Sequence, residues 1–203
     1  MAQSRPRHRS AAHGAPGKLR IIGGSLRGSK LAVPDRADLR PTPDRVRETL
    51  FNWLAGAIDG ARCLDLYAGT GALGIEALSR GAAACTFVER DRELAREIRA
   101  NLDRLKVDRG RVECADALAF LGGAPTAFDL VFLDPPFRAG SWERAARDLE
   151  TRGWLAESAR IYLERPDEMA DIVLPANWTA HREGRAGGVR YGLYRRLPRD
   201  PLS

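Results

Sequence analysis

The segment from residue 63 to residue 74 constrains the fold most, because it joins an apolar strand to a helix through a glycine loop. It reads Cys-Leu-Asp-Leu-Tyr-Ala-Gly-Thr-Gly-Ala-Leu-Gly. Glycines let the backbone turn tightly and approach a ligand closely, and a helix N-terminus offers free N–H groups at its positive dipole end. Residues 69–74 also match the dinucleotide pattern G-x-G-x-x-G, which is a weak signal by itself. The segment predicts a ligand site at the carboxyl end of a strand in an open α/β sheet.

Asp65 indicates which ligand this loop takes. It stands four residues before Gly69, at the end of the predicted strand. A dinucleotide would bring its pyrophosphate to the helix start, where a carboxylate would repel it. The carboxylate instead suits a ligand that carries an ammonium or a sulfonium, such as S-adenosylmethionine.

Two further predicted strands end in acids. The strand 84–88 is followed by Glu89, which can accept hydrogen bonds from both hydroxyls of a ribose. Nicotinamide and methyl-donor cofactors share that need, so Glu89 does not separate them. The strand 111–115 is followed by Asp116, which can accept from an adenine amino group or cap the helix predicted over 117–121. These two roles of Asp116 are compatible.

The fourth of these strands ends in the sequence Asp134-Pro135-Pro136-Phe137. It follows the apolar run 128–133, which is typical of a buried parallel strand. Prolines fix φ and remove backbone donors, so the loop is stiff and its carbonyls are free to accept. A carboxylate and a rigid carbonyl can hold both hydrogens of an amino group, and the aromatic ring can stack on a base. The set suits an exocyclic amine of a nucleobase, although a plain turn after a core strand has the same residue types.

The whole chain alternates strand-like and helix-like segments, which predicts an α/β fold with a mostly parallel sheet. At 203 residues it is long enough for one domain with a real core. A first crossover helix is expected to contain residues 75–78 and to end near Gly81, and further helices are expected over 92–105 and over 142–149. A fifth strand is expected over 160–164. A closing hairpin is expected from strands 178–182 and 189–197, joined by the glycine-rich segment 184–188.

The positive charge of the chain is concentrated at its N-terminal end. Residues 1–50 hold 11 lysines and arginines against 4 acids, and the remainder holds 22 against 23. Residues 1–18 have arginines, prolines and small residues without an apolar run, which predicts a disordered basic arm. No segment has the length of a membrane span, and the arm lacks the apolar core of a signal peptide. We therefore expect a cytoplasmic protein, with a transit peptide as a weaker alternative.

After this arm, residues 19–55 predict a glycine-turned hairpin and a helix, which we place in one domain with the rest of the chain, 19–203. Thr42 is expected to cap this helix and Pro43 to be its first residue. Val46, Leu50, Trp53 and Leu54 form an apolar stripe that is expected in the core. Because the excess charge clusters in this region, we interpret its cations as an RNA phosphate clamp, with a solvated face as the alternative. The candidate RNA-binding residues are Arg20, Arg27, Lys30, Arg40, Arg45 and Arg47.

Cysteine and histidine usage excludes several other classes of site. Cys63, Cys85 and Cys114 each fall in a predicted strand, so we expect small buried side chains in a reducing compartment. The 3 histidines make no metal-binding pattern, so we predict no metal.

At this point the chain resembles a known family, the bacterial methyltransferases that modify the N2 amine of one guanine in 16S rRNA. The resemblance runs from about Leu19 to Tyr194, and its most specific parts are the run from Arg40 to Leu54 and the Asp-Pro-Pro-Phe sequence. Shorter matching segments include Arg20–Gly24, Asp65–Gly74, Glu76–Arg80 and Gly153–Leu155.

The resemblance implies a class I (Rossmann-like) methyltransferase fold with a mostly parallel seven-stranded sheet, helices on both faces and an N-terminal hairpin. It implies S-adenosylmethionine as cofactor, with Asp65, Gly69 and Gly71 at its methionine end. Glu89 would hold the ribose and Asp116 the adenine. Three residues would hold the target guanine: Asp134, Pro135 and Phe137. The implied partner is 16S rRNA in an assembled or assembling small ribosomal subunit, and no feature demands more than a monomer.

Three other functions are consistent with parts of the sequence. The Asp-Pro-Pro-Phe sequence by itself identifies an amine and not a base, so adenine or cytosine amino-methylation is one alternative. A nicotinamide-dependent enzyme is another, which Asp65 disfavours. A non-enzymatic RNA-binding module is the third, and it would leave the pairing of the glycine loop with Asp134 unexplained.

Overall fold

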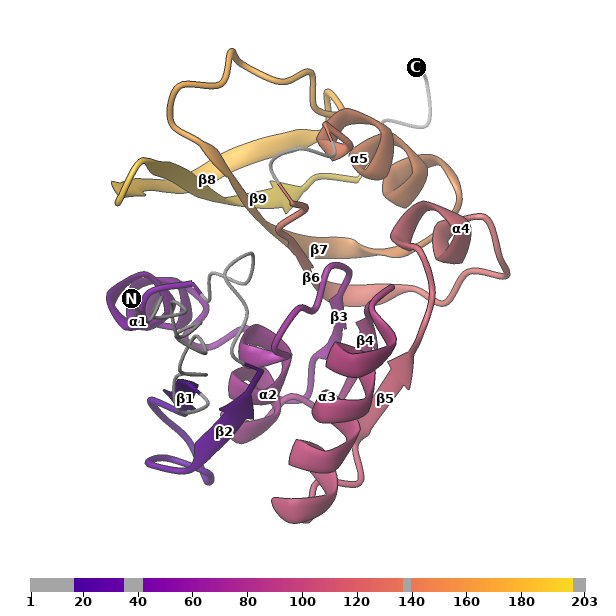
Figure 1. Ribbon diagram of the computed structural model, residues 1–203. Helices are drawn as coiled ribbons and strands as arrows, with labels where there is room; N and C mark the ends of the chain where they lie inside the picture. The colour runs from indigo at the N-terminus through magenta and orange to yellow at the C-terminus, as the bar shows by residue number, and fades with distance from the viewer. Residues whose placement is uncertain (1–16, 35–41, 137–139, 199–203) are drawn as a thin grey trace, which may run out of the picture.

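The computed structural model describes residues 17–34, 42–136 and 140–198, and it has the expected three-layer α/β architecture (Figure 1). The central sheet has seven strands in the order β5-β4-β3-β6-β7-β9-β8. Its strands are β3 (Arg62–Asp65), β4 (Ala84–Val88), β5 (Gly110–Glu113), β6 (Phe128–Leu133), β7 (Leu155–Pro166), β8 (Trp178–Ala186) and β9 (Val189–Arg196). The first five in chain order pair in parallel, whereas β9 is antiparallel to both β7 and β8. The fold class predicted from the sequence is confirmed.

Alternate residues of each central strand face two different apolar layers. On one face of the sheet, Cys63, Phe87 and Phe132 pack in a cluster with α1 (Asp44–Trp53), α2 (Ala72–Ser79) and α3 (Arg92–Arg104). Their neighbours Leu64, Val88 and Leu133 pack in the other, with α4 (Ala117–Leu121) and α5 (Trp142–Thr151). This period of two is what a sheet buried on both faces requires.

The strand order reverses between β3 and β6, which fixes the place of the site. From β3 the chain continues outward to β4 and β5, and it then returns to lay β6 on the other side of β3. The crossover connections therefore diverge at this point and leave a crevice at the carboxyl ends of β3 and β6. Asp65 ends β3 and Asp134 follows β6, so the two acids singled out in the sequence flank the crevice.

The N-terminal hairpin packs on the helix layer rather than in the sheet. Its strands β1 (Gly17–Arg20) and β2 (Lys30–Val33) pair antiparallel, so the hairpin includes the last two residues of the predicted arm; the rest of the arm lies outside the described residues. Leu31 is fully buried in the cluster that holds α1 to α3. The buried Asn101 side chain of α3 both donates to and accepts from the Ala32 backbone, each at 3.1 Å. The hairpin is thereby joined to the layer of α1 to α3.

Several element boundaries differ from the expectation. The cap of α1 is Pro43 rather than Thr42, with φ −56° and ψ 146°, and its carbonyl accepts from Val46 N and Arg47 N. β7 extends far beyond the predicted 160–164, and β8 and β9 continue through most of the predicted loop to a turn at Gly187-Gly188. Both glycines have positive φ, which lets two residues reverse the chain.

The expectation for the cysteines is correct at two positions and wrong at the third. Cys63 and Cys85 are buried, and burial raises the pKa of the Cys63 thiol to about 12. Cys114 is exposed, because β5 ends at Glu113 and the residue lies in the connection to α4.

Candidate functional site

The glycine loop places the start of α2 against the end of β3. Gly69 and Gly71 have φ of 53° and 75°, a left-handed conformation that other residues adopt only with strain. Gly74 is needed for a different reason, because a Cβ at this position would overlap the Phe87 ring and lie 2.7 Å from Cys85 Sγ. The absence of side chains therefore keeps α2 close to β3 and β4, with the free N–H groups of its first turn at the crevice.

Asp65 is buried under this helix start. Its Oδ2 accepts from Gly74 N at 3.0 Å, and the residue is 3 % exposed. Burial raises the pKa of Asp65 to about 7; repulsion by Glu89 adds to the rise and the Gly74 N–H opposes it. A buried carboxylate that has no cationic partner among the described residues favours a cationic group in the ligand.

Glu89 stands on the other side of the loop and holds its backbone. One carboxylate oxygen accepts from Gly69 N at 2.8 Å and the other from Asp91 N at 2.8 Å. Each oxygen keeps a second lone pair that can accept from a ribose hydroxyl. Asp116 is exposed at the next strand end, and its Oδ1 caps α4 by accepting from Leu118 N and Ala119 N. The structure thus shows the predicted capping role of Asp116 and leaves its second oxygen available.

Asp134 and Pro135 lie across the crevice from this loop. Asp134 is partly buried, Pro135 is buried and Pro136 is exposed, whereas Phe137 lies outside the described residues. No described residue donates a hydrogen bond to the Asp134 carboxylate. Desolvation, together with repulsion by Glu164 and Asp65, raises its pKa well above the ordinary carboxyl range. The carboxylate is therefore desolvated and has acceptor capacity for a ligand amine.

Glu164 has no predicted role in the sequence, and the structure places it beside Asp134. It lies near the end of β7, is 6 % exposed and accepts from Tyr162 Oη at 2.8 Å. Burial raises its pKa above the usual value. A signal was present in the sequence, because Glu164 follows an apolar strand in the same way as Asp65, Glu89 and Asp134 do. The site consequently holds one more carboxylate than predicted.

The structure leaves four cations of the predicted phosphate clamp exposed and buries a fifth, Arg47. Arg20, Arg27, Lys30 and Arg45 are exposed, and Arg40 lies outside the described residues. The Arg47 side chain is fully buried, and its Nη2 donates to the Arg20 carbonyl at 2.8 Å and to Asp44 Oδ1 at 2.7 Å. Arg47 also lies 3.6 Å from the buried carboxylate of Glu76. It is a structural cation between the hairpin, α1 and α2, and it cannot contact RNA from this position.

Comparison with known proteins places the chain in a family. Residues 19–195 match the family described as "Conserved hypothetical protein 95". The chain belongs to this family. A relative from Escherichia coli, "Ribosomal RNA small subunit methyltransferase D", is 52 % identical over 184 residues, which cover 91 % of this chain and 93 % of the relative. The protein of the same name from Haemophilus influenzae is 44 % identical and covers 89 % and 95 %.

A solved structure with a similar sequence has the same fold as this chain. The "putative methyltransferase yhhF" from Escherichia coli is 51 % identical, and the match covers 90 % of this chain and 100 % of that chain with a TM-score of 0.83. The family resemblance seen in the sequence is therefore confirmed over most of the chain.

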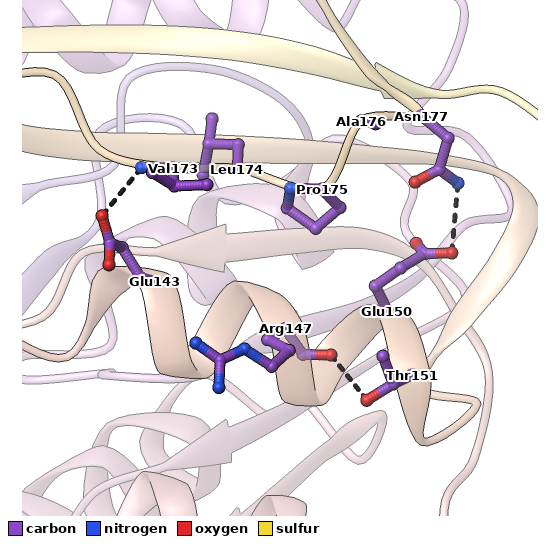
Figure 2. Close-up of a pocket in the computed structure, with 9 residues that line it drawn as sticks. All are labelled: Glu143, Arg147, Glu150, Thr151, Val173, Leu174, Pro175, Ala176 and Asn177. Carbon is purple, nitrogen blue, oxygen red and sulfur yellow. Dashed lines mark hydrogen bonds between the residues drawn. The ribbon is translucent and has the colours of Figure 1, made fainter.

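Other features of this family member lie apart from the crevice. Figure 2 shows a pocket between α5 and residues 173–177, none of whose lining residues is a candidate site residue. Its Glu143 accepts a hydrogen bond from Val173 N at 2.8 Å. The Glu150 carboxylate accepts hydrogen bonds from the side chains of Asn177, Trp178 and Arg196. Within the described residues no helix is long and apolar enough to cross a membrane, and no group of three potential ligands could hold a metal ion.

Proposed function

We propose that this protein transfers a methyl group from S-adenosylmethionine to the exocyclic N2 amine of a guanine in the rRNA of the small ribosomal subunit. The observation that carries the proposal is the pairing, at the switch point of the sheet, of the glycine loop and Asp65 with the Asp134-Pro135 acceptors. The names of the relatives support methyl transfer to small-subunit rRNA, and the sequence resemblance adds the guanine N2 atom. The partner is the rRNA of an assembled or assembling subunit in the cytoplasm, and the protein acts as a monomer.

The residues of the crevice fit S-adenosylmethionine. When bound, this cofactor supplies a methyl group on a positively charged sulfur that leaves as a neutral thioether. Asp65 offers a buried negative charge to the cationic methionine end, and Gly69 and Gly71 let the backbone approach it. Glu89 accepts from the ribose hydroxyls, and Asp116 accepts from the adenine amino group with the oxygen that does not cap α4.

Asp134 and Pro135 act on the target amine. The lone pair of guanine N2 is delocalised into the ring, so the amine is a poor nucleophile. Asp134 and the Pro135 carbonyl accept its two N–H bonds and turn the lone pair toward the methyl group. The bound cofactor would supply the methyl group to N2 and leave as the thioether, and the N2 proton would pass to Asp134 or to water. Holding both reactants in this geometry supplies much of the rate. Phe137 stacks on the base once it has left its helix or loop.

Cofactor affinity should depend on pH through Asp65. Its pKa of about 7 in the free protein means that the carboxyl is protonated below pH 7 and loses its attraction for the cationic ligand. We expect the affinity for S-adenosylmethionine to weaken by up to about tenfold for each pH unit below 7 and to level off above it. Titration calorimetry from pH 5.5 to 8.5 measures this, and Asp65→Asn should bind weakly with a flatter profile. An equally steep profile in Asp65→Asn would assign the titration to another group.

The same pKa shift has an opposite effect on folding. Because the pKa of Asp65 is higher in the folded protein than its usual value of 3.8, folding favours the protonated form. The contribution of Asp65 to the free energy of unfolding is therefore largest at low pH and falls as the pH rises from about 4 to about 7. Asp65→Asn should raise the Tm at pH 8 while it weakens cofactor binding.

RNA binding should depend on the exposed N-terminal cations. We expect the triple variant Arg20→Gln, Arg27→Gln, Arg45→Gln to bind rRNA more weakly. The slope of log K against log salt should become shallower by about 0.7–0.9 for each phosphate contact removed. Filter binding between 50 and 300 mM salt would show both effects. Arg147→Gln, an exposed arginine of α5, is the control. A slope equal to that of the control would assign these cations to an ordinary solvated face.

Methyl transfer itself is tested with labelled S-adenosylmethionine on small subunits and on naked rRNA from cells that lack this modification. We expect label in the RNA of at least one of the two substrates. Absence of label from both would favour the non-enzymatic RNA-binding module.

A further inference from the structure

The register between β6 and β7 brings two carboxylates side by side at the crevice. Leu130 to Leu133 pair in parallel with Arg160 to Leu163, so Asp134 and Glu164 are the next residues along two adjacent strands. Residues at equivalent positions of neighbouring strands point to the same face of a sheet and lie about 5 Å apart at their backbones. Electrostatic repulsion between these two acids contributes to the raised pKa of Asp134.

Glu164 is held in place but retains acceptor capacity. Its backbone carbonyl accepts from Trp142 Nε1 at 2.7 Å, and its Oε2 accepts from Tyr162 Oη at 2.8 Å. No cation among the described residues pairs with it, and no described residue donates to Oε1. A carboxylate that is 6 % exposed and has one donor is costly to keep unless a ligand supplies another. The methyl-transfer step derived above does not use this group.

Two adjacent carboxylates match one nucleobase edge better than the others. Guanine presents two neighbouring donors on its Watson–Crick edge, the N1–H and the N2 amino group. Adenine and cytosine present an amino group beside a ring nitrogen that carries a lone pair. When Glu164 is ionised, that lone pair would face a carboxylate oxygen and leave both acceptors without a proton, which is strongly unfavourable in a buried site.

We propose that Glu164 selects guanine by accepting its N1–H, while Asp134 and the Pro135 carbonyl accept the N2 hydrogens. This assignment rests on the proposed function and adds to it the residue that distinguishes guanine from adenine and cytosine. Asp134 and Pro135 bind any exocyclic amine, whereas Glu164 reads the ring atom beside that amine.

A purely structural role for Glu164 makes a different prediction. Tyr162 is fully buried and its hydroxyl needs an acceptor, which Glu164 provides. In Glu164→Gln the amide oxygen still accepts from Tyr162 Oη, and its NH2 group then faces the base. If Glu164 served only Tyr162, this variant would treat all bases as the wild type does. If it reads N1–H, the variant should disfavour a donor at N1 and favour an acceptor.

The test compares guanine with 2-aminopurine at the nucleotide that the wild type methylates. 2-Aminopurine keeps the exocyclic amine at C2 but has a lone pair at N1. It can be introduced in a synthetic RNA oligonucleotide that is ligated into the subunit rRNA. We expect Glu164→Gln to lower kcat/KM for guanine by about tenfold to a hundredfold, the range for losing a hydrogen bond to a charged group. The ratio of guanine to 2-aminopurine activity should fall by at least as much. Comparing ratios cancels the effect of the O6 atom that 2-aminopurine also lacks.

Two controls separate this effect from loss of folding or of cofactor binding. Glu157→Gln changes an exposed glutamate of the same strand and should leave both activities unchanged. The affinity of Glu164→Gln for S-adenosylmethionine should equal that of the wild type. An unchanged guanine to 2-aminopurine ratio in Glu164→Gln would overturn the assignment while leaving the proposed function intact. Failure of the wild type to label any guanine would instead overturn the proposed function.

Discussion

Replacing Asp134 by alanine is expected to abolish methyl transfer while S-adenosylmethionine still binds with nearly wild-type affinity. The variant removes the carboxylate that accepts from the target amine and leaves the glycine loop, Asp65 and Glu89 unchanged. Loss of one preorganised polar group at the reacting atoms costs about a hundredfold to a thousandfold in kcat, and loss of the amine's orientation adds to it. Single-turnover transfer of label to rRNA and calorimetry with the cofactor measure the two effects separately.

The matched control for this variant is Asp103→Ala, which removes an exposed carboxylate of α3. It should retain wild-type turnover. Turnover by Asp134→Ala within a few-fold of the control would contradict the assignment of Asp134 to the amine. Lost cofactor binding in Asp134→Ala would indicate that the acid supports the cofactor rather than the base.

Replacing Glu76 by alanine is expected to destabilise the fold more than any other single change considered. The Glu76 side chain is fully buried and accepts from Ile22 N and Gly23 N, each at 2.8 Å, and from Arg80 Nε at 2.7 Å. Without this carboxylate the buried charge of Arg47 loses its nearest buried anion. Removing one partner of a buried ion pair costs about 3–5 kcal/mol. Urea unfolding should therefore show a lower midpoint, and the lost acceptors should loosen the hairpin from α2.

Glu48→Ala is the control for Glu76→Ala, because Glu48 is an exposed glutamate of the neighbouring helix α1. We expect its free energy of unfolding to lie within about 0.5 kcal/mol of the wild type. Alanine is a good helix former, so helix propensity does not explain a loss at either position. A similar small effect in Glu76→Ala would mean that the buried network contributes little to stability.

Features that depend on a local pattern were predictable from the sequence. The apolar residues before Asp65 and Asp134 predict buried strands. The glycines after Asp65 predict the tight turn that follows the first of these strands. Alternation of strands and helices then implies a parallel sheet with its ligands at the carboxyl ends. The sequence therefore predicts Asp65, Glu89 and Asp134 at one edge of the sheet, and in the structure they end or directly follow β3, β4 and β6.

Features that depend on tertiary partners were not predicted. The clustering of positive charge predicts an RNA contact for Arg47, and nothing in the local sequence shows that the hairpin covers it. A signal existed in its spacing, since the buried Phe51 and Leu54 lie four and seven residues further along the same helix face. Glu164 ends an apolar run in the sequence, but its place beside Asp134 follows from the pairing of β7 with β6, which the sequence does not show.

The central claim is tested most directly by identifying the nucleoside that receives the methyl group. Small subunits that lack this methylation are incubated with the protein and labelled S-adenosylmethionine, and the RNA is then digested to nucleosides and analysed by mass spectrometry. The account predicts labelled N2-methylguanosine. Label in a methylated adenosine or cytidine would contradict the choice of base while keeping the chemistry of Asp134, and no label in any nucleoside would contradict the account as a whole.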